Sequence, residues 1–132
     1  MNAVEAFYVA IEKFVPNFRL DNCQEFNEIT IKKTDSFGLE MGCTIVHSSS
    51  IQIVVEFLNV WNIEICFGGG SMALIEPFIE PSIASTAGRE YFQFFDEMTK
   101  SRWYFETIRL VEVIPGGKEK GSGLNGTAEY VT

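Results

Sequence analysis

The residue types that most often carry out chemistry are sparse in this chain. His47 is the only histidine, and Cys23, Cys43 and Cys66 are the only cysteines. Cys43 and His47 share one face of an expected strand, where four residues separate them by roughly 13 Å. One metal ion cannot bridge that distance, although Cys23 or Cys66 could approach His47 in space. No triad pattern accompanies these residues, so we expect no catalytic residue, no metal site and no cofactor.

Two other sequence features could support chemistry. Gly68-Gly69-Gly70-Ser71 could hold an anion with backbone N–H groups. The segment lacks the lysine of a phosphate-binding loop, so a glycine-rich turn or bulge is the better interpretation. Glu76 and Glu80 are four residues apart, and Glu56 and Glu64 lie on neighbouring expected strands. Such carboxylates do acid–base work only when burial raises one pKa, and we predict a solvated acidic loop instead.

Charge is the most informative feature of the composition. The chain carries 18 Asp and Glu against 10 Lys and Arg, a formal net charge of −8. This balance argues against direct nucleic-acid binding, because phosphate contacts need clustered Lys and Arg. An acidic surface instead attracts a basic partner and accelerates its association.

The cysteines and the N-terminus bear on the compartment. Three cysteines without a CxxC spacing do not form a disulfide framework, and we expect them to be buried free thiols. Residues 1–16 lack the basic start of a signal peptide. No apolar run approaches the roughly 20 residues of a membrane span. These observations predict a cytoplasmic protein that does not contact a membrane.

Apolar periodicity predicts the elements that must position these residues. Helices are expected over 2–15, with an apolar stripe from Val4 to Val15, and over 87–100, where Tyr91, Phe94, Phe95 and Met98 recur at helical spacing. Alternating apolar residues predict strands over 28–33, 39–47, 51–58, 60–67 and 103–114. The segment 71–85 contains Pro77 and Pro81 and is expected to be an extended loop.

The resulting fold class is α+β, in the order α-β-β-β-β-α-β. Its simplest architecture is a single antiparallel sheet of about five strands with two helices packed on one face. The composition changes at Pro115-Gly116-Gly117, after which apolar residues are rare. We therefore expect one domain over 1–115 and a flexible glycine-rich tail over 116–132.

In size, acidity and lack of catalytic motifs, the chain is similar to small cytoplasmic immunity proteins that neutralise basic toxins or nucleases. This resemblance covers no specific residues. It implies a non-enzymatic protein that inhibits or sequesters a basic protein partner. Two alternatives stay open: a small-molecule-binding domain or small enzyme with a pocket between sheet and helices, and an assembly subunit of a homo-oligomer.

The expected contact surface combines the acidic loop with the predicted second helix. Phe78 and Ile79 would be the apolar anchor that usually dominates interface energy. The carboxylates around them would act on association rate and specificity. The predicted contact residues are Glu76, Phe78, Ile79, Glu80, Glu90, Asp96 and Glu97.

Overall fold

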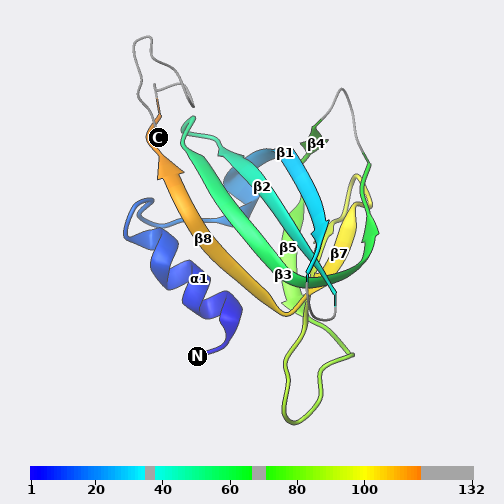
Figure 1. The fold of residues 1–132 in the computed structure, drawn as a ribbon. Coiled ribbons are helices and arrows are strands. Elements are labelled where there is room, and N and C mark those ends of the chain that lie inside the picture. The colour runs from blue at the N-terminus through cyan, green and yellow to red at the C-terminus, as the bar shows by residue number, and fades with distance from the viewer. Residues whose placement is uncertain (35–37, 67–70, 117–132) are drawn as a thin grey trace.

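The structure is a computed structural model that describes residues 1–34, 38–66 and 71–116. The described chain is mostly β-sheet, with one α-helix and one short 3₁₀ turn (Figure 1). The elements are α1 (Ala3–Glu12), η1 (Leu20–Asn22), β1 (Cys23–Lys33), β2 (Leu39–His47), β3 (Gln52–Glu64), β4 (Met72–Ala73), β5 (Pro77–Pro81), β6 (Phe92–Asp96), β7 (Arg102–Phe105) and β8 (Thr107–Ile114).

The eight strands form one sheet in which every pair is antiparallel. The strand order is β4-β1-β2-β3-β7-β6-β5, and β8 also pairs with β3. Residues 52–58 of β3 pair with β8, whereas Trp61 and Glu64 pair with β7. We call β4, β1, β2, β8 and the start of β3 the first half of the sheet. The end of β3 with β7, β6 and β5 is the second half.

Two asparagines bend β3 where it passes from one half to the other. Asn59 and Asn62 have φ angles of 55° and 52°. Asparagine is one of the few residues that adopt this left-handed conformation readily. The pairing register with β2 shifts beside Asn59, and the register with β7 shifts around Asn62, as expected of β-bulges. Figure 1 shows β3 curving from its place beside β2 toward β7.

The bend brings the inner faces of the two halves together. The ring of Phe26 in β1 lies 5.1 Å from that of Phe94 in β6 and 5.5 Å from that of Trp103 in β7. These strands are not neighbours in the sheet, so the contacts show that the sheet folds over itself. Phe57 and Phe105 extend the same fully buried aromatic cluster. Aromatic side chains bury more apolar area than most other residues, so this cluster makes a large contribution to the stability of the core.

Helix α1 lies along β8 (Figure 1). Asn2 caps it: the Asn2 side chain accepts from the Glu5 N–H at 2.8 Å, and the Glu5 carboxylate accepts from the Asn2 N–H at 2.9 Å. The helix buries Val4, Phe7 and Ile11 against the core. A helix at the N-terminus was expected, but it ends at Glu12 and leaves Phe14 exposed.

The expected second helix over 87–100 is absent, so the prediction of two helices on a sheet of about five strands is wrong. Those residues form β6 and its flanking turns. Phe92 and Phe94 point inward, whereas Tyr91 and Phe95 are half-buried on the opposite side. The spacing of the aromatics fits both a helix and an alternating strand. Pairing with β5 and β7 selects the strand.

Other expected boundaries also differ. Residues 51–58 and 60–67 belong largely to one long strand, β3, because Asn59 makes a bulge rather than a turn. The expected strand over 103–114 divides at Glu106 into β7 and β8, which pair with different parts of β3. The strand expected over 28–33 begins earlier, at Cys23. The predicted loop over 71–85 contains β4 and β5.

Strand β5 shows how two prolines fit an edge strand. The Glu97 N–H donates to the Glu76 carbonyl, and the Ser82 N–H donates to the Tyr91 carbonyl. By alternation, Phe78 and Glu80 also exchange hydrogen bonds with β6. The backbone N and C=O groups of Pro77, Ile79 and Pro81 therefore point toward the free edge. Of these three residues, only Ile79 has an N–H there. This arrangement blunts the edge against pairing with another strand.

Two further expectations concern the C-terminal tail and membrane-spanning segments. The predicted tail over 116–132 lies outside the described residues, apart from Gly116. In the described residues, no helix has the length and apolar character needed to cross a bilayer.

The bend in β3 predicts a specific sensitivity at Gly38. Its φ is 88°, and a Cβ there would lie 2.2 Å from Oδ1 of Asn59. We expect Gly38→Ala to lower the free energy of unfolding by about 1–3 kcal/mol, measured by urea denaturation. A Cβ at Gly88 meets no atom within 4 Å, so Gly88→Ala should change it by less than about 0.5 kcal/mol. Equal losses in the two variants would contradict this role for Gly38.

Candidate functional site

The outer side of the second half carries five half-buried aromatic side chains. Residues directly opposite each other on paired strands share a face, so the register groups them: Trp61 lies opposite Tyr104, and Phe78 lies opposite Phe95. Tyr91 precedes β6 and contacts Trp61. None of the five belongs to the buried core cluster. We call this surface the aromatic face, and its members are Trp61, Phe78, Tyr91, Phe95 and Tyr104.

The rings of the aromatic face contact one another in two groups. Trp61 stacks on Tyr104 with ring centroids 5.5 Å apart and meets Tyr91 edge to face at 5.1 Å. Phe78 and Phe95 form a T-shaped pair at 5.5 Å. Such contacts hold the rings in place at the surface. The face is therefore a preorganised apolar platform rather than a set of mobile side chains.

Carboxylates border the platform at β5. Glu76 and Glu80 are exposed and flank Phe78 at two-residue spacing, which puts all three on the outer side of the strand. Glu97 directly follows β6, donates its N–H to the Glu76 carbonyl and is exposed. In the described part of the chain, neither Glu76 nor Glu80 forms an ion pair.

The cationic side chains on and beside the aromatic face already have acidic partners within the chain. Arg89 donates from Nε and Nη2 to Glu106 at 2.8 and 2.5 Å, and its guanidinium lies 5.7 Å from the Tyr91 ring centroid. The hydrogen bond from Arg89 holds the pKa of the Glu106 carboxyl below its ordinary value. Lys100 lies 3.4 Å from Glu97 and 5.8 Å from the Phe95 ring centroid. Arg102 lies 3.4 Å from Glu64.

The structure divides the predicted contact residues. Glu76, Phe78, Glu80 and Glu97 lie together on the outer side of the second half, whereas Ile79 lies opposite the buried Phe94 and packs against the core. Glu90 is exposed in the loop before Tyr91.

Asp96 is fully buried and has a structural role. Its carboxylate accepts hydrogen bonds from the backbone N–H groups of Ile75, Met98 and Thr99 at 2.8, 3.1 and 3.0 Å. These bonds hold the β6–β7 turn and tie it to the segment before β5. Asp96 is therefore not available to a partner.

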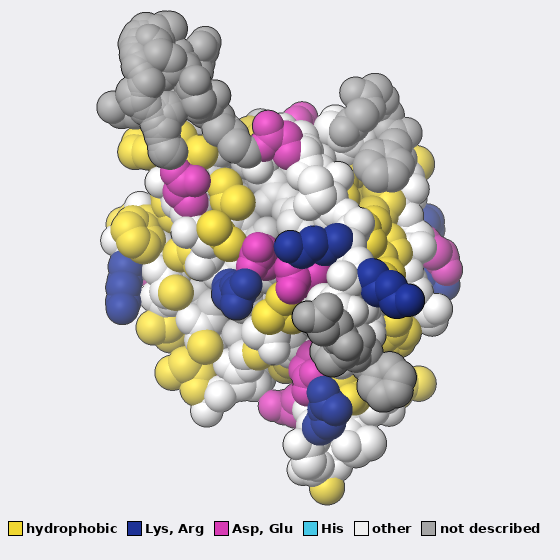
Figure 2. Space-filling view, viewed as in Figure 1, with side chains coloured by type: hydrophobic (Ala, Val, Ile, Leu, Met, Phe, Trp, Pro, Cys, Tyr) yellow, Lys and Arg dark blue, Asp and Glu magenta, His cyan; other side chains and the backbone are white. Residues whose placement is uncertain are grey.

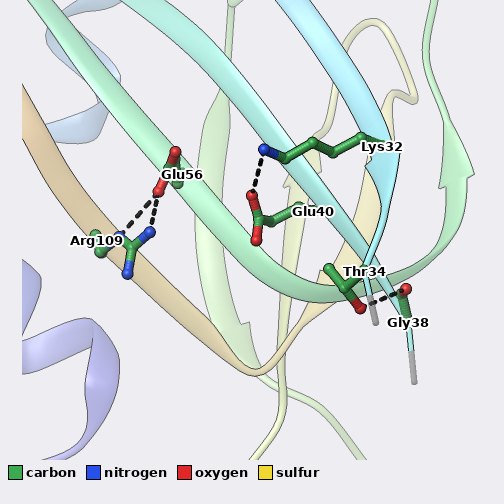
Figure 3. A network of polar contacts seen from close by, with 6 residues as sticks. All are labelled: Lys32, Thr34, Gly38, Glu40, Glu56 and Arg109. Carbon is green, nitrogen blue, oxygen red and sulfur yellow. Dashed lines mark hydrogen bonds and ion pairs between the residues drawn. The ribbon is translucent and has the colours of Figure 1, made fainter. Parts of the chain in front are cut away.

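The outer side of the first half has a different character. Figure 2 shows basic and acidic side chains in contact near the centre of this side. Lys32 pairs with Glu40 at 3.4 Å, and Arg109 is hydrogen bonded to Glu56 across β8 and β3 (Figure 3). These charges largely neutralise one another. This polar face, defined by Lys32, Glu40, Glu56 and Arg109, has no marked excess of charge at its centre.

His47 has a local structural role. Its Nδ1 accepts from the Ser49 N–H at 3.2 Å and contacts the Ser49 Oγ at 2.8 Å. Because the backbone N–H can only donate, the neutral ring carries its proton on Nε2. The ring stacks on Phe18 with centroids 6.0 Å apart, and burial lowers the pKa of His47. In the described residues, no carboxylate is hydrogen bonded to this ring.

The cysteines differ from expectation at one position. Cys23 and Cys43 are buried, whereas Cys66 is exposed because it follows the end of β3. Burial raises the pKa of the Cys23 thiol to about 12 and also raises that of Cys43. Thiols with such values are poor nucleophiles at neutral pH. Across the described ranges, no three His, Cys, Asp or Glu side chains are grouped to hold a metal ion.

Sequence reasoning missed four residues of the aromatic face. Helical spacing predicts that Tyr91 and Phe95 pack in the core, and strand alternation alone gives Trp61 and Tyr104 no functional role. The available signal was that, if residues 91–95 form a strand, Phe92 and Phe94 face one side while Tyr91 and Phe95 face the other, so that only one pair can enter the core. Nothing in the sequence indicated that Trp61 would lie opposite Tyr104, because that contact depends on pairing between β3 and β7.

Comparisons with protein-family profiles, curated proteins and solved structures found no significant match to this chain. The function is therefore inferred from the aromatic face and the charges around it.

The buried role of Asp96 predicts a difference between two neighbouring carboxylates. Asp96→Ala should lower the free energy of unfolding by about 2–4 kcal/mol, because three backbone N–H groups lose a charged acceptor. Glu97→Ala removes an exposed carboxylate and should cost less than about 1 kcal/mol. Urea denaturation of both variants measures this difference. Similar losses would contradict the structural role of Asp96.

The environment of His47 predicts a pH-dependent stability. The folded-state pKa is below the ordinary value of 6.5, so the unfolded chain binds more protons as the pH falls through 6.5. The thermal midpoint of the wild-type protein should therefore decrease when the pH is lowered from 7.5 to 5.5. His47→Gln removes the only histidine and should show a smaller fall, measured by circular dichroism. An equal fall in both proteins would exclude His47 as the cause.

Proposed function

We propose that this chain is a non-enzymatic cytoplasmic protein that binds, and thereby inhibits or sequesters, a basic protein partner through the aromatic face. The observation that carries this proposal is the position of Phe78. Its ring lies half-buried on the outer side of an edge strand, packed against Phe95, with the exposed Glu76 and Glu80 on either side.

The aromatic face has the composition of a protein-binding surface. Aromatic side chains are enriched at the centres of interfaces, where they supply large contact areas at low entropic cost. The ring contacts fix Trp61, Phe78 and Tyr104 before any partner arrives. Less side-chain freedom is lost on binding as a result.

The charges favour a basic partner. Arg89, Lys100 and Arg102 are each paired with a carboxylate, which leaves Glu76 and Glu80 unpaired beside the rings. Unpaired carboxylates at the rim of an apolar surface attract a cationic partner over several ångströms and repel an acidic one. This local imbalance has the same sign as the net charge of −8.

The alternative functions receive less support from the described residues. Glu56 and Glu64 lie on the outer sides of different halves and do not line a common pocket. A homo-oligomer joined at this surface would place the unpaired Glu76 and Glu80 of two copies near each other. Pairing at the edge of β5 is opposed by Pro77 and Pro81, which lack N–H donors.

Partner capture followed by binding kinetics tests the proposal. The immobilised wild-type protein should retain a basic protein from a lysate of its own cells, and the double variant Glu76→Lys/Glu80→Lys should not. Glu12→Lys/Glu112→Lys is the matched control, because it makes the same charge change at α1 and β8, away from the aromatic face. With the captured partner purified, the Glu76/Glu80 variant should associate about tenfold more slowly at low salt.

Phe78→Ala separates the anchor from the charges. The variant should leave the association rate nearly unchanged and speed dissociation about tenfold, because apolar anchors act mainly on the lifetime of a complex. Surface plasmon resonance measures both rates, and circular dichroism confirms folding. A partner that is acidic, or one whose binding responds equally to the control variant, would contradict the proposal.

A further inference from the structure

We infer that the aromatic face selects arginine over lysine side chains of its partner, and that Glu80 with Phe78 forms the recognition position. This inference rests on the proposed function and specifies the chemistry of the partner.

The chain shows within itself how this surface holds cations. Arg89 combines a two-point hydrogen bond to Glu106 with a position over the Tyr91 ring. Lys100 combines an ion pair with Glu97 and a position over the Phe95 ring. In both cases the cation contacts a carboxylate and an aromatic ring. Arg89 has the shorter and two-point contact, whereas Lys100 and Arg102 each lie 3.4 Å from a single carboxylate oxygen.

Glu80 is a carboxylate two residues from the ring of Phe78, and no side chain of the described residues forms an ion pair with it. Glu80 lies opposite Gln93, which lies opposite Tyr104. Phe78 is two residues away on the same side of β5, a separation of about 7 Å. A cation at Glu80 therefore has the Phe78 ring along β5 and the Gln93 side chain across on β6, with Tyr104 one strand beyond Gln93.

The pairing of a carboxylate with an aromatic ring at this position favours a guanidinium. A guanidinium is flat, so one edge can donate two hydrogen bonds to Glu80 while its face lies on an aromatic ring. A lysine ammonium is strongly hydrated and offers neither the flat face nor the paired donors. Arginine and lysine are both attracted by the negative charge of Glu80. The difference between their affinities therefore reports the stacking and paired hydrogen bonds that only arginine can make.

Glu76 extends the surface along β5. It lies on the same outer side as Glu80, four residues earlier and about 13 Å away, with Phe78 between them. A partner surface that carries two arginines at this separation, with an apolar residue between, would match all three side chains.

Two octapeptides of equal charge test this inference with the full-length protein. Octa-arginine and octa-lysine are titrated by calorimetry at low salt. We expect octa-arginine to bind about fivefold more tightly to the wild-type protein, because its side chains stack as well as pair. In the variants Glu80→Gln and Phe78→Leu, the ratio of the two dissociation constants should fall to near one. Glu112→Gln removes the same charge on β8 and should leave the ratio unchanged.

The outcomes separate this inference from the proposed function. Equal binding of the two peptides, weakened by Glu76→Lys/Glu80→Lys, would overturn arginine selection and still place a basic ligand on the aromatic face. A preference for arginine that persists in Glu80→Gln and Phe78→Leu would also overturn the inference. Peptide binding that no substitution on the aromatic face weakens would count against the proposed function as well.

Discussion

The contact of Phe26 with Phe94 and Trp103 is the interaction on which the rest of the structure depends. It joins strands from the two halves of the sheet, and it forms only because β3 bends at Asn59 and Asn62. Burying these rings supplies a large part of the apolar area that offsets the entropy of folding. The packing carries a cost as well, since the Trp103 indole N–H is buried and has no hydrogen-bond partner among the described residues.

The aromatic core also determines what lies on the opposite side of the second half. Successive residues of a strand face opposite sides, so inward Phe92 and Phe94 require Tyr91, Gln93 and Phe95 to face outward. The register then brings Phe78 and Tyr104 beside them. The core and the aromatic face are thus two consequences of one strand pairing. A change of register by one residue would exchange them.

The two outer sides of the sheet differ in how their charges are satisfied. On the polar face, Glu40 and Glu56 have cationic partners within the chain, so a second protein would have to replace existing ion pairs (Figure 3). On the aromatic face, Glu76 and Glu80 have no such partners in the described residues, and half-buried rings lie next to them. Binding there adds electrostatic contacts without first breaking any. This difference is why we propose the aromatic face, rather than the polar face, as a partner-binding surface.

The sequence by itself determined the features that depend on local patterns. These are the N-terminal helix, the central strands around residues 39–47 and 51–58, the acidic charge, and the choice of Glu76, Phe78 and Glu80 as neighbours on one surface. The acidic charge follows from composition, and the other features follow from residue spacing within a few positions.

Only the tertiary structure decided the remainder. Residues 87–100 match a helix and a strand equally well by spacing, and pairing with β5 and β7 made part of them a strand. Asn59 could have ended a strand, but pairing on both sides of it kept β3 continuous. Asp96 became a buried acceptor, and Trp61 joined the aromatic face, through contacts with residues 21 and 43 positions away. Such long-range contacts compete with local preference and leave no local signal, because the sequence does not show which strands will pair.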